Sequence, residues 1–361
     1  MAAVSCDVGP VAVTGASGFV GAHVVGALLA RGYSVHACLR DASNPEKTNP
    51  LHRLAAESSG GLTVFQADLL DAGGHDDAFR DCAAVLHVGT PMGYGGANRP
   101  QQVYDGAIAG TENVLESIDR AGTIKRLVYT SSFAAIGHPA PPGYRYTEAD
   151  WASDGREDDP AWRAEGLDQK GEIGYAMAKV AMERRVFAAA EADGRFDAIA
   201  VCPLVVLGPL LSRAHELVGS WQWHLGRTLA GKANQRGWKH LWNIVDVRDV
   251  ATAQALILES PECSTGDRFQ LSATDSSGEL DVREIQACLQ RNFPDLDVGG
   301  PPPEFDAIIE RHGQVWQGPL AHCDLARSVL GLRTYPVEDT LVETARTLLE
   351  LGLVEPRKRT V

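Results

Sequence analysis

Three glycines placed directly after an apolar run constrain the fold of this chain more than any other feature. Residues 11–14 (VAVT) predict a strand, which the segment TGASGFVG follows. An amphipathic helix is expected to begin after Gly21 and to end at Gly32. In this spacing Gly15 permits a tight turn, Gly18 lets the backbone approach a pyrophosphate, and Gly21 packs the helix on the strand. The motif predicts a dinucleotide-binding turn, although a turn made only for packing is the alternative when the motif is taken alone.

Strand-like and helical segments alternate through the first two thirds of the chain. Further strands are expected over residues 34–39, 62–65, 84–88, 126–130 and 198–202, with a helix over 105–121. Such an alternation indicates a doubly wound parallel α/β sheet of the Rossmann type.

The last third predicts a smaller mixed α/β lobe that binds substrate, with segments at 249–259, 268–273, 280–292 and 337–351. We therefore expect a nucleotide-binding domain over 8–205, with a strand and a helix contributed by about 240–260, and a lobe formed mainly by 206–361.

Composition narrows the class of protein. The 361 residues are 44% hydrophobic and carry a formal net charge of −14, which favours a globular protein and argues against nucleic-acid binding. The seven cysteines are scattered without a CxxC pair, and no apolar stretch reaches the length of a membrane span. We expect reduced thiols, no metal site, no membrane segment and a cytoplasmic monomer or homodimer.

Tyr175 and Lys179 stand four residues apart in a segment expected to be helical, so their side chains share one face. A lysine ammonium beside the phenol lowers the pKa of Tyr175 from about 10 toward neutrality, so the phenol can donate a proton. Upstream, Thr130-Ser131-Ser132 closes the fifth strand at the edge where ligands bind in such sheets, and one of these hydroxyls can hydrogen-bond a substrate carbonyl. A surface helix and a turn cap are the structural alternatives for these two segments.

The cofactor is predicted from the end of the second strand. An acidic residue at that place would bind the ribose 2′-hydroxyl of NAD, whereas this chain has Arg40, followed by Lys47. Two cations can clamp a 2′-phosphate, so we expect NADP(H), although Asp41 partly offsets their charge. Asp68 and Leu69, after the third strand, are expected beside the adenine.

A long segment rich in Trp, Pro, Gly and Asp runs into Tyr175 and predicts a substrate lid at about 154–174. The side chains expected to form an apolar pocket under it are Met92, Tyr94, Phe133, Leu207, Trp221 and Trp223. The alternative is that these aromatic residues simply cover the sheet.

Taken in order, TGASGFVG, LRDASNPEK at 39–47, Asp68-Leu69, LHVGTPM at 86–92, Thr130-Ser-Ser132, YAMAK and CPLVVLGP at 202–209 form a recognisable set. The set resembles the extended short-chain dehydrogenase/reductases, within the branch of dihydroflavonol reductases, cinnamoyl-CoA reductases and yeast carbonyl reductases. The resemblance covers roughly residues 10–275.

The resemblance implies that Ser132 orients the carbonyl, Tyr175 is the general acid, and Lys179 holds the nicotinamide ribose and tunes the phenol. It implies a cofactor site made of Thr14, Gly15, Ser17, Gly18, Phe19, Val20, Gly21, Arg40, Lys47, Asp68, Leu69, Val88, Gly89, Thr90, Thr130, Pro203, Leu204 and Val205. Two positions depart from relatives. Ala109 replaces a helix asparagine of the catalytic tetrad, and Gly137 aligns with the substrate-reading asparagine of flavonoid reductases, so a flavonoid substrate is not supported.

These observations predict an NADPH-dependent reductase that acts on a small aromatic or apolar aldehyde or ketone and also runs in reverse as an alcohol oxidation. A nucleotide-sugar epimerase on the same fold remains open. A dehydratase is disfavoured because Phe133-Ala134-Ala135 stands where its acidic pair would follow. A non-catalytic NADP-binding protein is the other alternative, but it would be expected to lose the Tyr175 and Lys179 pair.

Overall fold

The structure is a computed structural model. It describes residues 3–91, 100–137, 140–141, 143–153, 171–215, 218–232, 242–273, 280–301 and 321–359; within 171–173 it describes the backbone. The expected lid at 154–174 and the predicted pocket residues Met92 and Tyr94 therefore lie largely or wholly outside the described residues.

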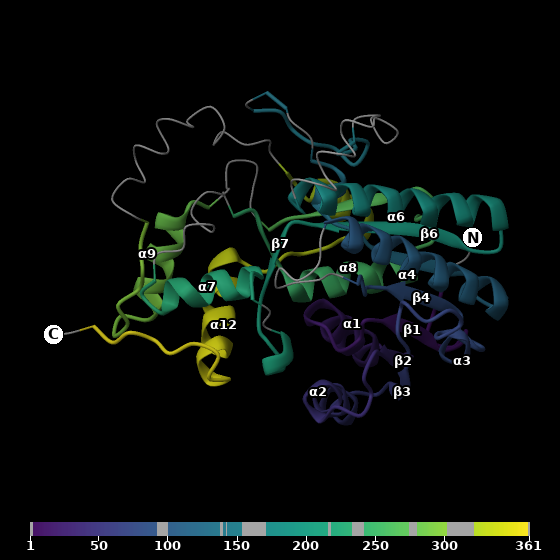
Figure 1. The fold of residues 1–361 in the computed structure, drawn as a ribbon, viewed down its shortest axis with the longest axis horizontal. Helices are drawn as coiled ribbons and strands as arrows, with labels where there is room; N and C mark the ends of the chain where they lie inside the picture. Colours follow the sequence, from purple (N-terminus) through teal and green to yellow (C-terminus); the bar gives the residue numbers. More distant parts are fainter. Residues whose placement is uncertain are drawn as a thin grey trace.

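A seven-stranded sheet forms the centre of the molecule (Figure 1), with strand order β3-β2-β1-β4-β5-β6-β9 and every pair parallel. Its strands are β1 (Val11–Thr14), β2 (Ser34–Leu39), β3 (Gly61–Gln66), β4 (Ala84–His87), β5 (Arg126–Thr130), β6 (Asp197–Pro203) and β9 (Arg268–Leu271). The central strands are buried along their whole length because helices cover both faces. The predicted doubly wound sheet is confirmed.

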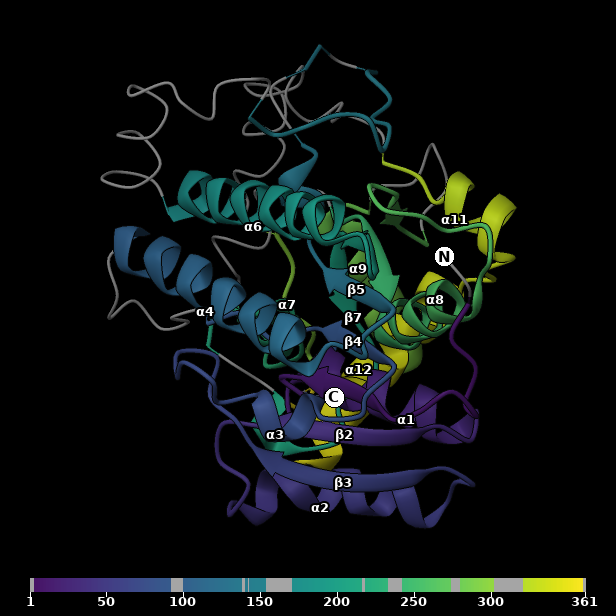
Figure 2. The ribbon, with the colours of Figure 1, turned by 90° about the vertical axis from the view of Figure 1, so that its right-hand side faces the viewer.

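The helices form two layers, one on each face of the sheet (Figure 2). One layer holds α3 (Asp76–Phe79), α4 (Pro100–Ala121) and α6 (Gly171–Asp193), whose apolar sides share a core cluster with β4, β5 and β6. The other holds α1 (Phe19–Ala30), α2 (Pro45–Ala56), α8 (Val247–Glu259) and α11 (Asp324–Leu330) around a second cluster. A short 3₁₀ helix, η1 (Phe133–Ala135), follows β5.

A smaller lobe lies beside the carboxyl edge of the sheet, at the left of Figure 1. It contains the two-stranded parallel sheet of β7 (Val205–Leu207) and β8 (Ile244–Asp246), together with η3 (Arg213–His215), α7 (Trp221–Leu229), α9 (Val282–Asn292) and α12 (Val337–Glu350). Its core is a separate cluster that includes Leu225, Trp242 and Leu348, each nearly or fully buried.

Two segments lie elsewhere than the sequence predicts. The segment 268–273 is expected in the lobe, but β9 pairs with β6 in the main sheet. The helix expected from about 240–260 is α8, which packs on α1 of the nucleotide-binding domain as expected. The strand expected from about 240–260 is β8, which pairs with β7 and not with the main sheet. These pairings join residues far apart in the chain, so local patterns do not reveal them. The boundary near 205 itself stays a prediction.

The first helix also begins earlier than expected, at Phe19, so that Gly21 lies inside it. Among the described residues, no helix combines the length and apolar character needed to cross a membrane.

Candidate active site

The predicted glycine turn joins β1 to α1 at the carboxyl edge of the sheet. Gly15 has φ +63°, and a Cβ there would stand 2.6 Å from Cα of Gly89 in the turn after β4. A Cβ on Gly21 would stand 2.2 Å from the Gly15 carbonyl oxygen. Gly18 is the N-cap of α1 and supplies no side chain to cap it. The first N–H groups of α1 are thus available at a close-packed turn, which suits a pyrophosphate.

Thr14 fixes the neighbouring turn. Its Oγ1 lies 2.7 Å from Nδ1 of His87 and accepts a hydrogen bond from the Gly89 amide at 3.2 Å. Burial lowers the pKa of His87 to about 3, so its ring is neutral. Val88, Gly89 and Thr90 follow as partly buried residues. The neutral His87 ring thus holds the Thr14 side chain at the end of β1.

The two cations predicted to select NADP(H) border the loop between β2 and α2. Arg40 is exposed directly after β2, and Lys47 lies in the first turn of α2. Asp41 accepts hydrogen bonds from the hydroxyl of Ser43 at 2.7 Å and from its amide at 3.2 Å. These bonds, together with the charge of Lys47, lower the pKa of Asp41. The carboxylate is thereby held by its own turn.

The expected adenine side is also ordered by local contacts. Asp68 Oδ1 accepts from the amide of Leu70 at 3.0 Å, and the Leu69 carbonyl accepts from Nδ2 of Asn113 on α4 at 2.8 Å. A Cβ on Gly89 would meet Leu69 Cδ1 at 3.1 Å. The segment after β3 therefore lies against the same turn as Gly15.

Lys179 is the most constrained of the predicted catalytic residues. It is 4% exposed, and its Nζ donates to the Thr130 carbonyl oxygen at 3.0 Å and to Oγ1 of Thr90 at 3.2 Å. The same nitrogen lies 5.9 Å from the ring centroid of Tyr175, a partly exposed residue one turn earlier in α6. Burial lowers the pKa of Lys179 to about 8. The Lys179 ammonium thus connects α6 to the end of β5 and to the turn after β4.

The three hydroxyls at the carboxyl end of β5 have different surroundings. Thr130 is buried, and Ser131 donates to a carboxylate oxygen of Glu183 at 2.5 Å. Ser132 is partly buried, and its Oγ accepts from the amide of Ala134 at 3.1 Å as the N-cap of η1. Its hydroxyl hydrogen remains available to a ligand, so Ser132 is the best placed of the three to bind a carbonyl.

The end of β6 closes the site on its far side. β6 ends at Pro203, the Leu204 amide donates to the Leu271 carbonyl at 3.3 Å, and Val205 begins β7. Because β1, β4, β5 and β6 are neighbours in the sheet, the predicted cofactor residues at their carboxyl ends lie along one edge.

The predicted substrate residues are divided between two clusters. Phe133 packs edge-on against Tyr146, with ring centroids 5.2 Å apart, on the α6 side. Leu207 has no exposed surface and belongs to the core of the lobe, where Trp221 packs against Trp242. Trp223 lies under the guanidinium of Arg227. The pocket stays a prediction, and the structure gives Leu207 a packing role.

The two positions that differ from the resembling family lie on different elements. Ala109, which the resemblance aligns with the tetrad asparagine, is exposed on α4. Gly137 lies beneath Phe133, and a Cβ there would stand 2.9 Å from Cε1 of that ring. A larger side chain at 137 would displace Phe133.

Two charged residues below the site were not predicted. Glu183 on α6 and Arg268 at the start of β9 form a buried ion pair. Glu183 had a signal in the sequence, since it follows Tyr175 and Lys179 at the same four-residue spacing. Arg268 had none.

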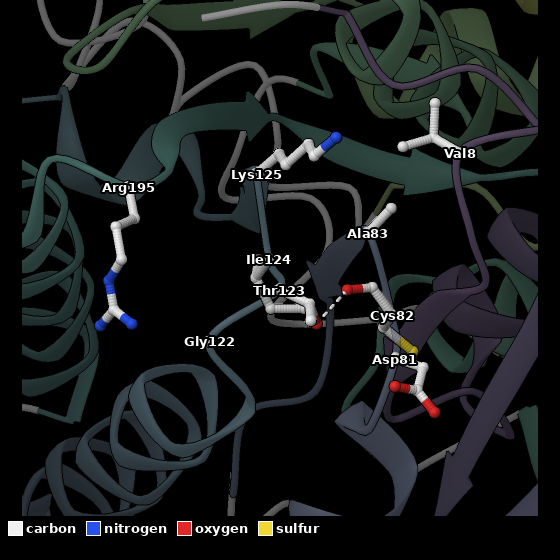
Figure 3. Close-up of a pocket in the computed structure, with 9 residues that line it drawn as sticks. All are labelled: Val8, Asp81, Cys82, Ala83, Gly122, Thr123, Ile124, Lys125 and Arg195. Atoms are coloured by element: carbon white, nitrogen blue, oxygen red, sulfur yellow. Dashed lines mark hydrogen bonds between the residues drawn. The ribbon is translucent and has the colours of Figure 1, made fainter.

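A surface pocket lies at the opposite edge of the sheet (Figure 3). Residues that precede β4, β5 and β6 line it, among them Asp81, Lys125 and Arg195. It is distant from the Tyr175 end of the fold and shares no residue with the predicted site. Among the described residues, no cluster of histidine, cysteine and carboxylate side chains is suited to hold a metal ion.

Known proteins are similar to this chain over most of its length. The model of the NAD dependent epimerase/dehydratase family matches residues 11–271. A dihydroflavonol 4-reductase from Hordeum vulgare is 30% identical over 300 residues, which cover 83% of this chain and 78% of the relative. Cinnamoyl-CoA reductase 1 from Petunia hybrida is 29% identical over 342 residues, with 95% and 92% covered.

Two solved structures share the fold. Gre2 from Candida albicans, in complex with NADPH, has a TM-score of 0.75 at 23% identity and covers 95% of this chain and 99% of its own. Vestitone reductase from alfalfa (Medicago sativa) has a TM-score of 0.73 at 24% identity, with 96% and 100% covered.

Proposed function

This chain belongs to the NAD-dependent epimerase/dehydratase family, and we propose that within it the protein is an NADPH-dependent carbonyl reductase. One observation carries the proposal. The buried Lys179 ammonium is held by Thr130 and Thr90 beside Tyr175, at the edge of the sheet where the glycine turn opens. An ammonium in that place favours ionisation of a neighbouring phenol and can bind ribose hydroxyls.

The described residues fit a nicotinamide dinucleotide. The uncapped start of α1 suits the pyrophosphate, and the approach of Gly15 to Gly89 leaves no room for a side chain between the two turns. Arg40 and Lys47 supply positive charge where a 2′-phosphate would lie, which supports NADPH rather than NADH. A reduced nicotinamide bound there would supply a hydride to the carbonyl carbon of the substrate.

The side chains would then divide the remaining work. Ser132 donates its hydroxyl hydrogen to the substrate oxygen and fixes the plane of the carbonyl. Tyr175 gives its phenolic proton to the same oxygen as negative charge develops there, which leaves an alcohol and a phenolate. Lys179 stabilises that phenolate through its charge and holds the ribose.

The proposed substrate is an aromatic or apolar aldehyde or ketone. Phe133, edge-on to Tyr146 beside Ser132, supports an apolar wall. The ring of Phe133 occupies the space above Gly137, so an amide side chain that reads a flavonoid does not fit there. These observations favour compounds smaller than flavonoids.

A screen of NADPH oxidation against aromatic aldehydes, aryl ketones and diketones tests the function. Tyr175→Phe should lower kcat by roughly 10²–10⁴-fold while NADPH binding survives. Tyr33→Phe is the matched control, because the buried Tyr33 hydroxyl donates to the Val4 carbonyl oxygen and takes no part in the site. Near-normal turnover by Tyr175→Phe would refute the mechanism. Conversion of a sugar nucleotide without net NADPH consumption would indicate the epimerase instead.

A further inference from the structure

Glu183 continues the catalytic face of α6 into the interior of the protein. It lies one turn beyond Lys179 and has no exposed surface. Its Oε2 accepts from the hydroxyl of Ser131 at 2.5 Å, and its Oε1 accepts from Nε of Arg268. Both carboxylate oxygens are therefore bound by donors, one of them a guanidinium, as a buried carboxylate requires.

Arg268 connects this carboxylate to the segment that follows Ser132. Its Nη1 donates to the carbonyl oxygens of Glu148 at 2.7 Å and Asp150 at 2.5 Å, and its Nη2 donates to that of Ala135 at 3.3 Å. The guanidinium also stacks on Trp151, 3.9 Å from the ring centroid. One side chain thus joins α6, β9, η1 and the loop around 148–151.

Tyr175 faces Lys179 from one turn earlier on α6, and three further ionisable groups around the ammonium are uncharged at neutral pH. Its Nζ lies 5.3 Å from the ring centroid of Tyr129, whose pKa burial raises well above its usual value. Burial likewise raises the pKa of Cys202 on β6 and lowers the pKa of His87 on β4 to about 3. Glu183, one turn later on the same face of α6, supplies negative charge that favours the ammonium form of Lys179 over its neutral form, although Arg268 partly offsets that charge.

Ser131 links the same carboxylate to the catalytic hydroxyl. Ser131 is 3% exposed, its amide donates to the Val201 carbonyl on β6 at 2.8 Å, and Ser132 is the next residue. A change in the Glu183 to Ser131 bond would move the start of η1 and with it the Oγ of Ser132. A displacement of about 1 Å at a reacting group can lower the rate by about two orders of magnitude.

We propose that Glu183, oriented by Arg268, is a positioning residue that keeps the Lys179 ammonium charged and fixes the end of β5 that presents Ser132. The proposal rests on the reductase function for its effect on rate. The effect of Glu183 on the charge of Lys179 can be measured without turnover.

Glu183→Gln tests the charge, because the amide retains the shape of the side chain. The rate of acetylation of Lys179 by acetic anhydride, read by peptide mass spectrometry across pH, gives the midpoint of its titration. We expect this midpoint to fall by about one pH unit or more in Glu183→Gln, since an opposite charge nearby has been removed. The alkaline limb of kcat should move to lower pH by the same amount. Glu183→Asp, which keeps the charge, should hold both near the wild-type values.

Asp197→Asn is the matched control. It breaks another buried ion pair of the same sheet, Arg126 to Asp197 at 3.3 Å, at the opposite ends of β5 and β6. It should lower stability without moving the midpoint or the pH profile. An equal loss of activity at every pH in Glu183→Gln, with an unchanged Lys179 midpoint, would overturn the proposal.

Arg268→Lys supplies a second test that does not depend on the folding of Glu183→Gln. It keeps the positive charge but loses donors to Glu148, Asp150 and Ala135, so kcat should fall at least about tenfold while the Lys179 midpoint and the Kd for NADPH hold. An unchanged kcat would contradict the role of Arg268 in holding the segment that follows Ser132. If the wild type reduces no carbonyl compound yet the midpoint falls in Glu183→Gln, the reductase function fails and the role of Glu183 toward Lys179 stands.

Discussion

Replacing Lys179 by methionine should stabilise the free protein while it abolishes turnover. The pKa of Lys179 is about 8 in the folded state, because of burial, and about 10.4 in an unfolded chain. A group that binds its proton less tightly when folded opposes folding at low pH, and stability rises as pH increases from about 8 to about 10.4. Near pH 7 the difference of about 2.4 units corresponds to about 3 kcal/mol.

Methionine removes this penalty but leaves the Thr130 carbonyl and the Thr90 hydroxyl without their donor, at a cost of about 1–2 kcal/mol. We expect Lys179→Met to exceed the wild type by about 1–2 kcal/mol near pH 7. The advantage should shrink by about 2 kcal/mol at about pH 9.5, where most of the wild-type penalty has gone.

Urea unfolding of the cofactor-free proteins, followed by tryptophan fluorescence at both pH values, measures the difference. Lys125→Met, at an exposed lysine, is the control and should show no pH-dependent gain. A stability difference between Lys179→Met and wild type that stays constant from about pH 7 to about pH 9.5 would refute the reasoning.

Three further predictions concern the cofactor and the fold. Arg40→Asp should raise the Kd for NADPH by at least about tenfold and leave NADH binding unchanged or improved, as measured by nucleotide fluorescence titration; equal losses for both would mean that Arg40 does not contact the 2′-phosphate. Asp249, whose pKa burial raises to about 7, should make stability fall as pH rises from about 4 to about 7. Asp249→Asn should abolish that fall and stabilise the protein at about pH 8 by at most about 4 kcal/mol, and a fall that persists in the variant would contradict the assignment. Gly15→Ala should lower stability by more than about 2 kcal/mol in thermal unfolding, because its Cβ would clash with Gly89 and its φ is left-handed; wild-type stability would show that the turns can separate.

Local patterns are sufficient to predict six of the seven strands of the main sheet. The β1 strand, the glycine turn and the strands at 34–39 and 126–130 each carry their signal within a few residues, and all appear in the structure. The motif predicts that α1 begins after its last glycine, but Gly21 lies inside the helix. The Gly15 carbonyl oxygen packs against Gly21 at a distance that leaves no room for a Cβ. The place of β9 depends on pairing with β6 across more than sixty residues, as seen between Ala200 and Arg268, and no local pattern encodes such a partner.

The site shows the same division between local and distant information. The spacing of Tyr175 and Lys179 predicted a shared helix face, and the structure places the Lys179 ammonium 5.9 Å from the Tyr175 ring centroid. The sequence did not reveal that Thr90 and Thr130 bind that ammonium, because both lie on other strands or turns. The apolar character of Leu207 predicts a pocket residue, but it is equally typical of a core residue. The structure buries Leu207 in the core of the lobe.

Glu183 and Arg268 lie far apart in the sequence, and this separation constrains the order in which α6 and β9 can fold during synthesis. The chain leaves the ribosome from its N-terminus, so α6 emerges long before β9, and the two residues of the pair are 85 positions apart. Until Arg268 appears, packing α6 on β5 and β6 would bury a carboxylate without its cation, which costs several kcal/mol. We therefore expect α6 of the nascent chain to pack on the sheet only after β9 has been synthesised. A fragment cut near residue 205 should remain unfolded, although it contains the glycine turn and α6.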